Sequence, residues 1–243
     1  MDSFKKQLLE RTKKFSNEVE QLSFSFGGFI YNPLNYGWAN HSEYLLNYVN
    51  HKPKAFFLGM NPGPFGMAQT AVPFGEVDFV TNWMKLTNQI NKPPKEHPNR
   101  PVLGLETTRS EVSGKRLWSF FSHRYPIASN FFSLYCVMNY CPLVFVDGGK
   151  TGKNIIPEKL PKEERIELEV VCDNYLDDML SLIEPENLVG IGRYAEKKLA
   201  EATNRLELKT SVTTILHPSP SNPLANRDWE GIVTKQLEDA KLW

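Results

Sequence analysis

The sequence predicts an α/β fold of three layers, in which helices cover both faces of a central, mainly parallel sheet. Short apolar runs typical of buried strands alternate along the chain with longer segments whose apolar residues recur at helical spacing. This alternation is typical of parallel strands joined by helices. Neither a linker nor an internal repeat divides the 243 residues, so we expect one α/β/α domain over residues 1–243.

The first half of the chain contains one clear strand among several helices. Residues 54–59 are a short apolar run, which predicts a buried strand, and a loop rich in proline and glycine follows over 60–75. Residues 91–112 are rich in proline and charge and are expected to be irregular. Helical spacing of apolar residues predicts helices over the first two dozen residues and over 42–50, 78–90 and 113–123.

The second half repeats the alternation more regularly. Residues 148–154 carry three glycines and two lysines and are expected to form a flexible, basic loop. The apolar runs predict strands over 131–143, 188–192 and 213–216. Helical periodicity predicts helices over 162–183, where Pro185 follows the end, and over 194–203 and 228–242.

Three predicted strand ends carry polar residues. Ligands of open parallel sheets bind beyond the carboxyl ends of the strands, so we examined the segments 59–75, 139–142 and 217–226. The candidate site residues in these segments are Asn61, Phe74, Asn139 and His217. Taken singly, each signal also has a structural explanation, since asparagine suits turns and a lone histidine is more often structural than reactive.

Composition restricts the class of protein. No apolar run approaches the roughly 20 residues needed to cross a bilayer, and the N-terminus resembles neither a secretory signal nor a clear transit peptide. We therefore expect an intracellular protein without a membrane partner. Cys136, Cys141 and Cys172 lack the paired spacing of a zinc or iron–sulfur site, which predicts three reduced, buried thiols and no metal centre.

Charge is balanced overall but unevenly distributed. The formal net charge is zero, yet residues 85–125 are mainly basic and residues 157–186 mainly acidic. Such a distribution could steer a polyanion to one face. Ordinary solvated surface explains it about as well.

Taken together, the three segments resemble those of the single-strand-selective monofunctional uracil-DNA glycosylases, a branch of the uracil-DNA glycosylase superfamily. The most specific match is the run Gly-Met-Asn-Pro-Gly-Pro-Phe-Gly-Met-Ala-Gln-Thr at 59–70. The resemblance also includes residues 96–106 and 110–114. It runs from about Tyr31 to the final helix and leaves about the first thirty residues, with the N-terminal helix, outside. It implies a uracil-DNA glycosylase-like fold without a cofactor or metal.

The resemblance implies a role for each matching site residue. Asn61 would position the hydrolytic water at the sugar C1′, and His217 would hydrogen-bond the uracil O2 as charge builds on the departing base. Phe74 would stack on the base, and the backbone amide of Met60 would add a contact to it. Asn139 would bind the Watson–Crick edge, and Gly63 would leave space at C5.

Two further regions resemble the family's DNA contacts. The loop of Gly152, Lys153 and Asn154 would approach the phosphates. The second region resembles a duplex-penetrating wedge with the helix after it, and its residues are Ser219, Pro220, Ser221, Asn222 and Arg227. Many family members have arginine where this chain has Ser221, so we expect weaker intercalation and a stronger bias toward single-stranded substrate. Ala71, where glycine is common, is expected to be a minor departure.

The implied activity is hydrolysis of the N-glycosidic bond of uracil and 5-substituted uracils, such as 5-hydroxymethyluracil, in single- and double-stranded DNA. It leaves an abasic site and starts base excision repair. The expected partner is DNA that contains uracil or oxidised pyrimidines, and we expect a monomer, nuclear in a eukaryote or cytoplasmic in a prokaryote.

Two other classes of function compete with this one. The first is a non-catalytic binder of damaged or single-stranded DNA, which would not need both Asn61 and His217. The second is an α/β enzyme that acts on free nucleosides, which would not need the basic loop and the wedge-like segment.

Overall fold

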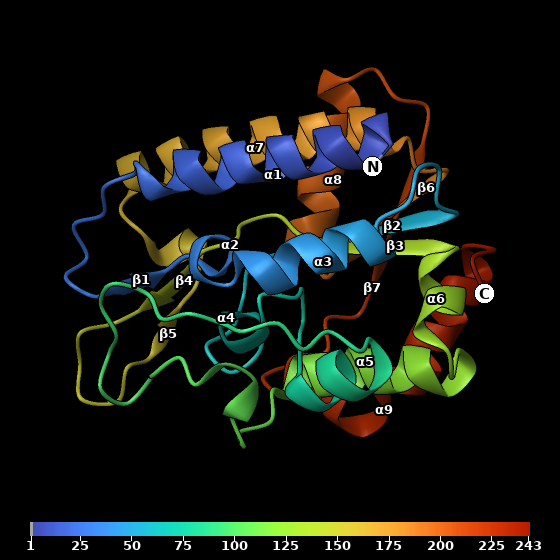
Figure 1. Ribbon diagram of the computed structural model, residues 1–243. Coiled ribbons are helices and arrows are strands. Elements are labelled where there is room, and N and C mark those ends of the chain that lie inside the picture. Colours follow the sequence, from blue (N-terminus) through green and yellow to red (C-terminus); the bar gives the residue numbers. More distant parts are fainter. Residues whose placement is uncertain (1) are drawn as a thin grey trace.

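A computed structural model describes residues 2–243 of the chain, and Figure 1 shows their arrangement around two small sheets. The larger sheet has four strands in the order β3-β2-β6-β7, and each neighbouring pair is parallel. Its strands are β2 (Ala55–Gly59), β3 (Tyr135–Asn139), β6 (Asn187–Ile191) and β7 (Ser211–Ile215). All five residues of β2 are buried, as expected for a strand covered on both faces.

Helices lie above and below this sheet in Figure 1, which confirms the predicted three-layer α/β/α class. On one side are α1 (Ser3–Glu20), α7 (Lys162–Ile183) and α8 (Arg193–Arg205). On the other side are α5 (Val112–Arg124), α6 (Ala128–Phe132) and α9 (Pro223–Asp239). Tyr44 of α3 (Trp38–Tyr48) donates a hydrogen bond of 2.7 Å to the carbonyl of Val137 in β3.

A second, antiparallel sheet was not predicted from the sequence. It contains β1 (Phe29–Tyr31), β4 (Val144–Val146) and β5 (Asn154–Ile155) in the order β1-β4-β5. Strands of two or three residues are too short to show the alternation that identifies a strand. The remaining elements are short: α2 (Pro33–Tyr36), α4 (Met67–Thr70), a π-helical turn η1 (Phe79–Trp83) and the 3-10 turns η2 (Gly104–Glu106) and η3 (Pro157–Lys159).

Two predicted elements are wrong in the structure. The helix expected over 78–90 ends after η1, because Lys85 adopts a left-handed backbone with φ of 56° and the N–H of Leu86 turns back to the carbonyl of Val80. The strand expected over 131–143 divides into the end of α6 and the shorter β3. Periodicity does not separate a short buried helix from a strand when every position is apolar.

Several element boundaries also differ from those expected. The loop predicted over 60–75 contains the single helical turn of α4, and α3 starts at Trp38 rather than at residue 42. The last helix begins at Pro223 rather than at residue 228, because Asn222 caps it and Asp228, with φ of −158°, forms only a kink inside it. In contrast, α7 has the bounds predicted from its apolar stripe.

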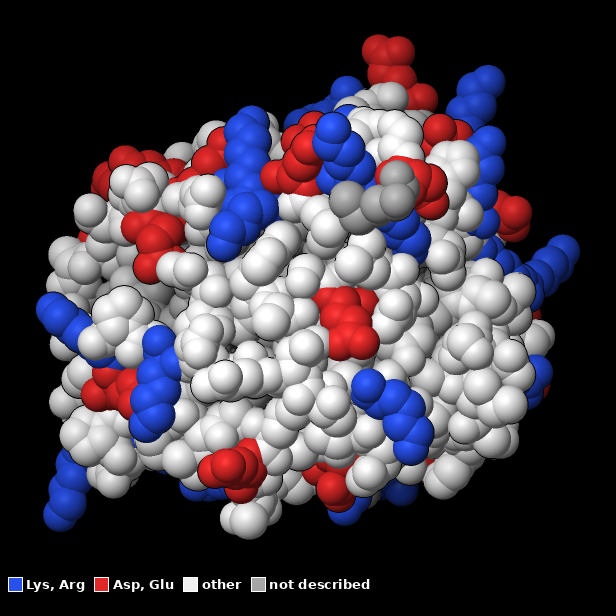
Figure 2. All heavy atoms as spheres, viewed as in Figure 1, with Lys and Arg blue, Asp and Glu red and all other residues white. Residues whose placement is uncertain are grey.

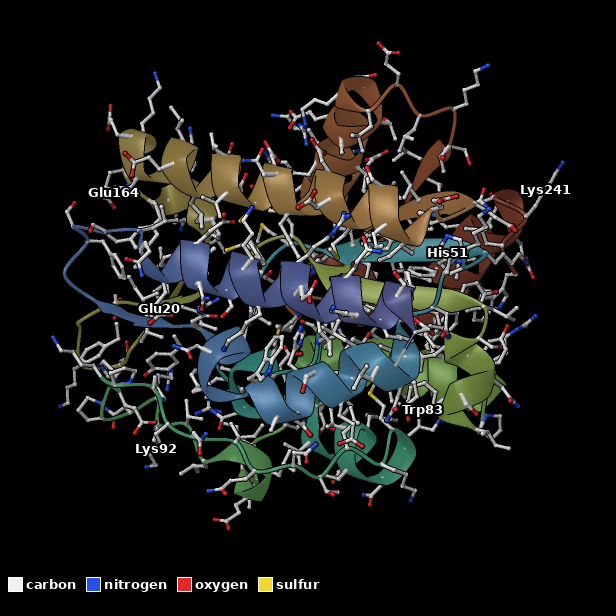
Figure 3. The ribbon with its side chains drawn as sticks, turned by 45° about the horizontal axis from the view of Figure 1, so that its top comes forward. Glu20, His51, Trp83, Lys92, Glu164 and Lys241 are labelled. Atoms are coloured by element: carbon white, nitrogen blue, oxygen red, sulfur yellow. The ribbon has the colours of Figure 1, made fainter. Side chains whose placement is uncertain are left out.

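The N-terminal helix is packed into the molecule. The rings of Phe15 and Tyr175 are stacked with centroids 3.9 Å apart, and the hydroxyl groups of Thr12 and Tyr175 are 2.8 Å apart. At the other end of α1, which Figure 3 marks with Glu20, the Glu20 carboxylate accepts a hydrogen bond of 2.8 Å from Asn32. Helix α1 therefore covers α7 and contributes directly to the core.

We predict that Phe15→Ala lowers the free energy of unfolding by about 3–5 kcal/mol, because it removes a buried aromatic ring and leaves a cavity beside Tyr175. Urea unfolding followed by circular dichroism measures the change. As a control, Lys6→Ala on the exposed face of the same helix should change the value by less than about 0.5 kcal/mol. A loss below about 1 kcal/mol for Phe15→Ala would contradict the packing described here.

Basic side chains of α8 partly neutralise the acidic residues of the segment 157–186. Residue Lys198 on α8 is only 5% exposed, and its ammonium group lies 3.2 Å from Glu169 and 3.4 Å from Asp173 on α7. Arg205 on the same helix pairs with Asp177 at 2.8 Å. Figure 2 shows Lys/Arg and Asp/Glu side chains interleaved along the top of the face in view, above the largely uncharged centre. Local pairing thus explains much of the acidic run.

Two sequence-based expectations about bulk properties can be compared with the structure. All three cysteines are buried and unpaired, as predicted. Among residues 2–243, no helix combines the length and the apolar character that crossing a bilayer requires.

Candidate active site

A cleft of about 500 Å³ lies beyond the carboxyl ends of the parallel strands. Its walls include Met60 directly after β2, Asn139 at the end of β3, Ile191 at the end of β6 and His217 two residues after β7. The three strand ends selected from the sequence therefore meet at one cleft, as the parallel topology requires. Ten of the predicted site residues line it: Met60, Asn61, Gly63, Phe74, Asn139, Asn154, His217, Ser219, Pro220 and Ser221.

The predicted residues Gly152, Lys153, Asn222 and Arg227 do not line this cleft. Lys153 and Arg227 are exposed, and each lies close in the sequence to residues that line the cleft. Asn222 is the N-cap residue of α9, because its side chain accepts a hydrogen bond of 3.0 Å from the N–H of Leu224. Of these four residues, only Lys153 and Arg227 are exposed, whereas Gly152 is buried.

The ring of Phe74 and the carboxamide of Asn139 meet over the backbone of Gly59. A Cβ added to Gly59 would lie 2.5 Å from the Phe74 ring and closer still to Asn139 Oδ1, so only glycine fits this position. The ring centroids of Phe74 and His217 are 6.3 Å apart. An aromatic face, a carboxamide and an imidazole are thus gathered in the cleft.

Phe74 is held in an unusual backbone conformation. Its φ of 53° lies in the left-handed region, which costs about 1–3 kcal/mol for a bulky residue. Helix α5 stabilises this conformation, because the indole Nε1 of Trp118 donates a hydrogen bond of 3.0 Å to the Phe74 carbonyl. At Gly114 a Cβ would collide with the same carbonyl. The ring is therefore oriented before any ligand arrives.

Ala71 shows the same backbone region, with φ of 59° at the end of α4. Glycine adopts this conformation without strain, whereas alanine does not. The expectation that alanine here is a minor departure therefore needs correction, because the substitution adds local strain. The buried Ala71 methyl faces Gly37, where a Cβ would collide with it.

The hydrogen bonding of His217 fixes its tautomer. The N–H of Ser219 donates a bond of 3.1 Å to Nδ1, so the neutral ring carries its proton on Nε2. Burial lowers the pKa of His217 below its usual 6.5, which favours this neutral form. Gly192, with φ of 91°, leaves the space for the ring, since its added Cβ would lie 3.1 Å from the His217 Cβ.

The carboxamide of Asn139 has an unused acceptor. Its Nδ2 donates to the sulfur of Met67 at 3.3 Å, whereas its buried Oδ1 finds no hydrogen-bond partner among residues 2–243. A buried acceptor without a protein partner is uncommon, and this one is available to a hydrogen-bond donor that enters the cleft. Asn61 also faces the cleft, and its Nδ2 donates to the Pro62 carbonyl at 3.2 Å.

Sequence reasoning missed two cleft residues with distinctive environments. Tyr194 lines the cleft, and its buried hydroxyl has no partner within residues 2–243. It follows the end of β6, a fourth strand end that the same rule would have selected. Glu111 also lines the cleft, where burial raises the pKa of its carboxyl group. Its place immediately before a helical segment was the available signal, since polar side chains cap helices.

The backbone of the loop over 148–154, which was expected to be flexible, accepts hydrogen bonds from side chains of residues 97–100. His97 Nε2 lies 2.7 Å from the Gly149 carbonyl, and Asn99 donates to Lys150 at 2.7 Å. Arg100 Nε donates to the Gly152 carbonyl at 2.8 Å. These bonds present the backbone around Lys153 in a fixed shape at one end of the cleft.

The segment after β7 is anchored to α5 by Arg116. Its guanidinium donates to the Pro218 carbonyl at 3.0 Å and to Asn226 Oδ1 at 2.8 Å. At the start of α9, the Leu224 side chain is 52% exposed, which is unusual for a leucine beside a polar loop. An anchored loop next to an exposed apolar side chain fits the wedge predicted from the sequence.

We predict that Arg116→Met makes amide hydrogen exchange within residues 217–226 about tenfold faster, because hydrogen bonds to a charged group contribute roughly 1.5–3 kcal/mol each. Exchange read by mass spectrometry measures this, and Lys115→Met, which alters the exposed neighbouring residue, is the matched control. Unchanged exchange in Arg116→Met would show that the segment is held by other contacts.

The residues described, 2–243, include no grouping of three or more His, Cys, Asp or Glu side chains placed to hold a metal ion. The fold and the cleft define an α/β protein whose concave site at the carboxyl edge of the parallel sheet is lined by an aromatic ring, carboxamides and an imidazole. The family model of the uracil DNA glycosylase superfamily matches residues 46–238. The chain belongs to this superfamily.

Curated relatives narrow the branch. The single-strand selective monofunctional uracil DNA glycosylase of Bos taurus is 43% identical over 235 residues, which cover 96% of this chain and 86% of the relative. The corresponding protein of Rattus norvegicus is 42% identical and covers 96% of this chain and 84% of the relative. This coverage corrects the expectation that about the first thirty residues lie outside the similarity, and it agrees with the packing of α1 into the core.

A solved structure supports the fold. The crystal structure of wild-type SMUG2 from Pedobacter heparinus aligns with a TM-score of 0.68 and covers 99% of this chain and 98% of that chain. Its sequence identity is 18%, so the comparison concerns the fold alone. The expected uracil-DNA glycosylase-like fold is confirmed.

Proposed function

We propose that the protein is a monofunctional uracil-DNA glycosylase, which hydrolyses the bond between uracil and deoxyribose, leaves an abasic site and so starts base excision repair. Membership of the superfamily makes the chain a DNA glycosylase. The observation that carries the specific proposal is the pairing, in one cleft, of a neutral His217 with a free Nε2–H donor and an Asn139 with an unused acceptor.

His217 is assigned to the departing base. Cleavage of an N-glycosidic bond generates a cationic sugar and an anionic base, so a donor aimed at uracil O2 stabilises the transition state more than the ground state. The hydrogen bond from Ser219 leaves the Nε2–H of the neutral imidazole for this task. Because a neutral donor keeps its proton, the base leaves as an anion.

Asn139, Phe74 and Met60 are assigned to base recognition. The Asn139 Oδ1 accepts from uracil N3–H, and the second hydrogen of its Nδ2 donates to O4. Cytosine presents the reverse pattern, and each unsatisfied buried group costs roughly 1–3 kcal/mol. Phe74 stacks on the ring, and the backbone amide of Met60 adds a contact.

Asn61 is assigned to the water that attacks C1′. A carboxamide is not a base, so it orients water rather than deprotonating it. The residues assigned to the base and to the water include no amine nucleophile, so the product retains an intact strand with an abasic site.

The finer substrate range follows from Gly63 and from the outer residues. Gly63 lacks a side chain, which leaves space for a 5-substituent such as the hydroxymethyl group. Single- and double-stranded DNA are both expected as substrates, and an oxidised pyrimidine is accepted as well as uracil. Flipping a base out of a duplex costs a few kcal/mol, to which contacts with the strand must contribute.

The DNA contacts are assigned to two segments. Gly152, Lys153 and Asn154 approach the phosphates, since the loop is held at the end of the cleft by His97 and Arg100. The wedge combines Ser219, Pro220, Ser221 and Asn222 with Arg227 on the following helix. Exposed Leu224 gives this segment an apolar side chain that can enter between bases.

We predict that Ser221→Arg increases the ratio of double-strand to single-strand cleavage rates several-fold, because arginine adds a phosphate-binding, base-stacking side chain at the wedge. Single-turnover rates on matched oligonucleotides measure the ratio, and Ser221→Ala is the control. An unchanged ratio for Ser221→Arg would contradict the expected single-strand bias.

A uracil-containing oligonucleotide tests the function. Incubation followed by alkali should release two fragments on a sizing gel, and without alkali the strand should stay intact. Binding without cleavage would favour a DNA-binding protein, and release of base from deoxyuridine alone would favour a nucleoside enzyme. Cleavage without alkali would contradict the monofunctional assignment.

A further inference from the structure

A carboxylate borders the space that Gly63 opens in the cleft. Apart from Gly63 and its two sequence neighbours, the atom nearest to a Cβ added at Gly63 would be Glu111 Oε1, at 4.0 Å. At Gly66 an added Cβ would lie 2.9 Å from the Glu111 Cγ, so the loop backbone packs directly against this side chain. The group across the space at Gly63 is therefore a carboxylate at a fixed position.

Helix α5 holds this carboxylate. Glu111 is the N-cap residue, and its two oxygens accept from the N–H of Ser113, at 3.2 Å, and from the N–H of Gly114. The positive end of the helix favours the ionised form, although burial opposes it and raises the pKa of the carboxyl. The two backbone hydrogen bonds orient the side chain without a ligand.

Glu111 has acceptor capacity to spare. Its carboxylate has about four lone-pair positions, and two accept backbone N–H groups. Among residues 2–243, no lysine, arginine or histidine forms an ion pair with it. A half-buried charge without a counter-ion gains from any additional donor that enters the cleft.

We propose that Glu111 determines which 5-substituents are accepted, favouring those that donate a hydrogen bond and disfavouring those that carry negative charge. The inference rests on the proposed uracil-DNA glycosylase function and on a base whose C5 faces Gly63. The hydroxyl of 5-hydroxymethyluracil donates to Glu111 Oε1. A 5-carboxyl group instead places a second anion beside the first, without a cation between them.

Glu111→Gln tests this assignment, since glutamine keeps the size and one acceptor for the helix cap while it removes the charge. The measurement is kcat/KM on single-stranded oligonucleotides with uracil, 5-hydroxymethyluracil or 5-carboxyuracil, each divided by the uracil value of the same variant. We expect the ratio for 5-hydroxymethyluracil to fall about tenfold, because a charge-assisted hydrogen bond is lost. The ratio for 5-carboxyuracil should rise about tenfold, because the repulsion between two like charges is removed. Glu158→Gln, at an exposed carboxylate on the rim of the same cleft, should leave both ratios unchanged.

Two results would overturn the inference: ratios that stay constant in Glu111→Gln, or an equal loss on all three substrates. If the unaltered protein fails to cleave uracil DNA, the proposed function itself is wrong, which is a different outcome. If Glu111→Gln does not fold, a measurement on the unaltered protein still tests the inference. Free 5-hydroxymethyluracil should inhibit uracil cleavage at least tenfold more strongly than free 5-carboxyuracil at neutral pH, and equal inhibition would contradict the role of Glu111.

Discussion

Asn61→Ala is expected to reduce single-turnover cleavage of uracil DNA by about a hundred- to a thousandfold, since a water displaced by about 1 Å from C1′ loses most of its reactivity. The side chain lies in the cleft and makes one local hydrogen bond, to the Pro62 carbonyl. Its removal therefore takes away an orienting group without opening a core cavity.

DNA binding separates a catalytic role of Asn61 from a structural one. Affinity for an oligonucleotide that carries a non-cleavable uracil analogue should stay within about threefold of the unaltered protein. Asn47→Ala, on the exposed face of α3, is the control for loss of a carboxamide in general. Equal losses of affinity and turnover in Asn61→Ala would assign the side chain to the fold of its loop.

The second large effect is expected for His217. His217→Ala removes the Nε2–H donor and should lower turnover by about a hundred- to a thousandfold, equivalent to roughly 3–4 kcal/mol of transition-state stabilisation. Affinity for the analogue should fall far less, because the donor contributes mainly when charge has built up on the base. A loss confined to KM would contradict this role.

The pH dependence follows from the same ring. Burial lowers the pKa of folded His217 below 6.5, so the ring is neutral in both the folded and the unfolded protein above that pH. The stability linked to this group is present above pH 6.5 and is lost as pH falls through the lower, folded pKa. Turnover should therefore stay level from pH 7 to below 6.5 before it declines. NMR titration of the ring checks the assignment, and an acid limb above pH 6.5 would contradict it.

Elements with a long apolar stripe could be predicted from the sequence, whereas those held by single contacts could not. Helix α7 has 22 residues and a continuous stripe, so its bounds were predicted. The strands β1, β4 and β5 have two or three residues each, and their pairing depends on distant partners such as Phe29 and Val146. The helix expected over 78–90 ends because of the backbone at Lys85, which periodicity does not report.

The candidate site divides in a similar way. Asn61, Asn139 and His217 could be selected because each lies at or just after the end of an apolar run that predicts a strand, and strand ends meet at one edge. The sequence could suggest Glu111 only as a helix cap and not as a cleft residue, since it enters the cleft from the start of α5 rather than from a strand end. Its position depends on how the loop at Gly66 packs against α5, which is a tertiary contact.

Helix α5 links three parts of the site that would otherwise be independent. Glu111 at its first turn faces the cleft, Arg116 holds the segment before α9, and Trp118 holds the backbone of Phe74. A helix moves as a rigid rod over such a short distance. A displacement of α5 is consequently expected to shift all three parts of the site together.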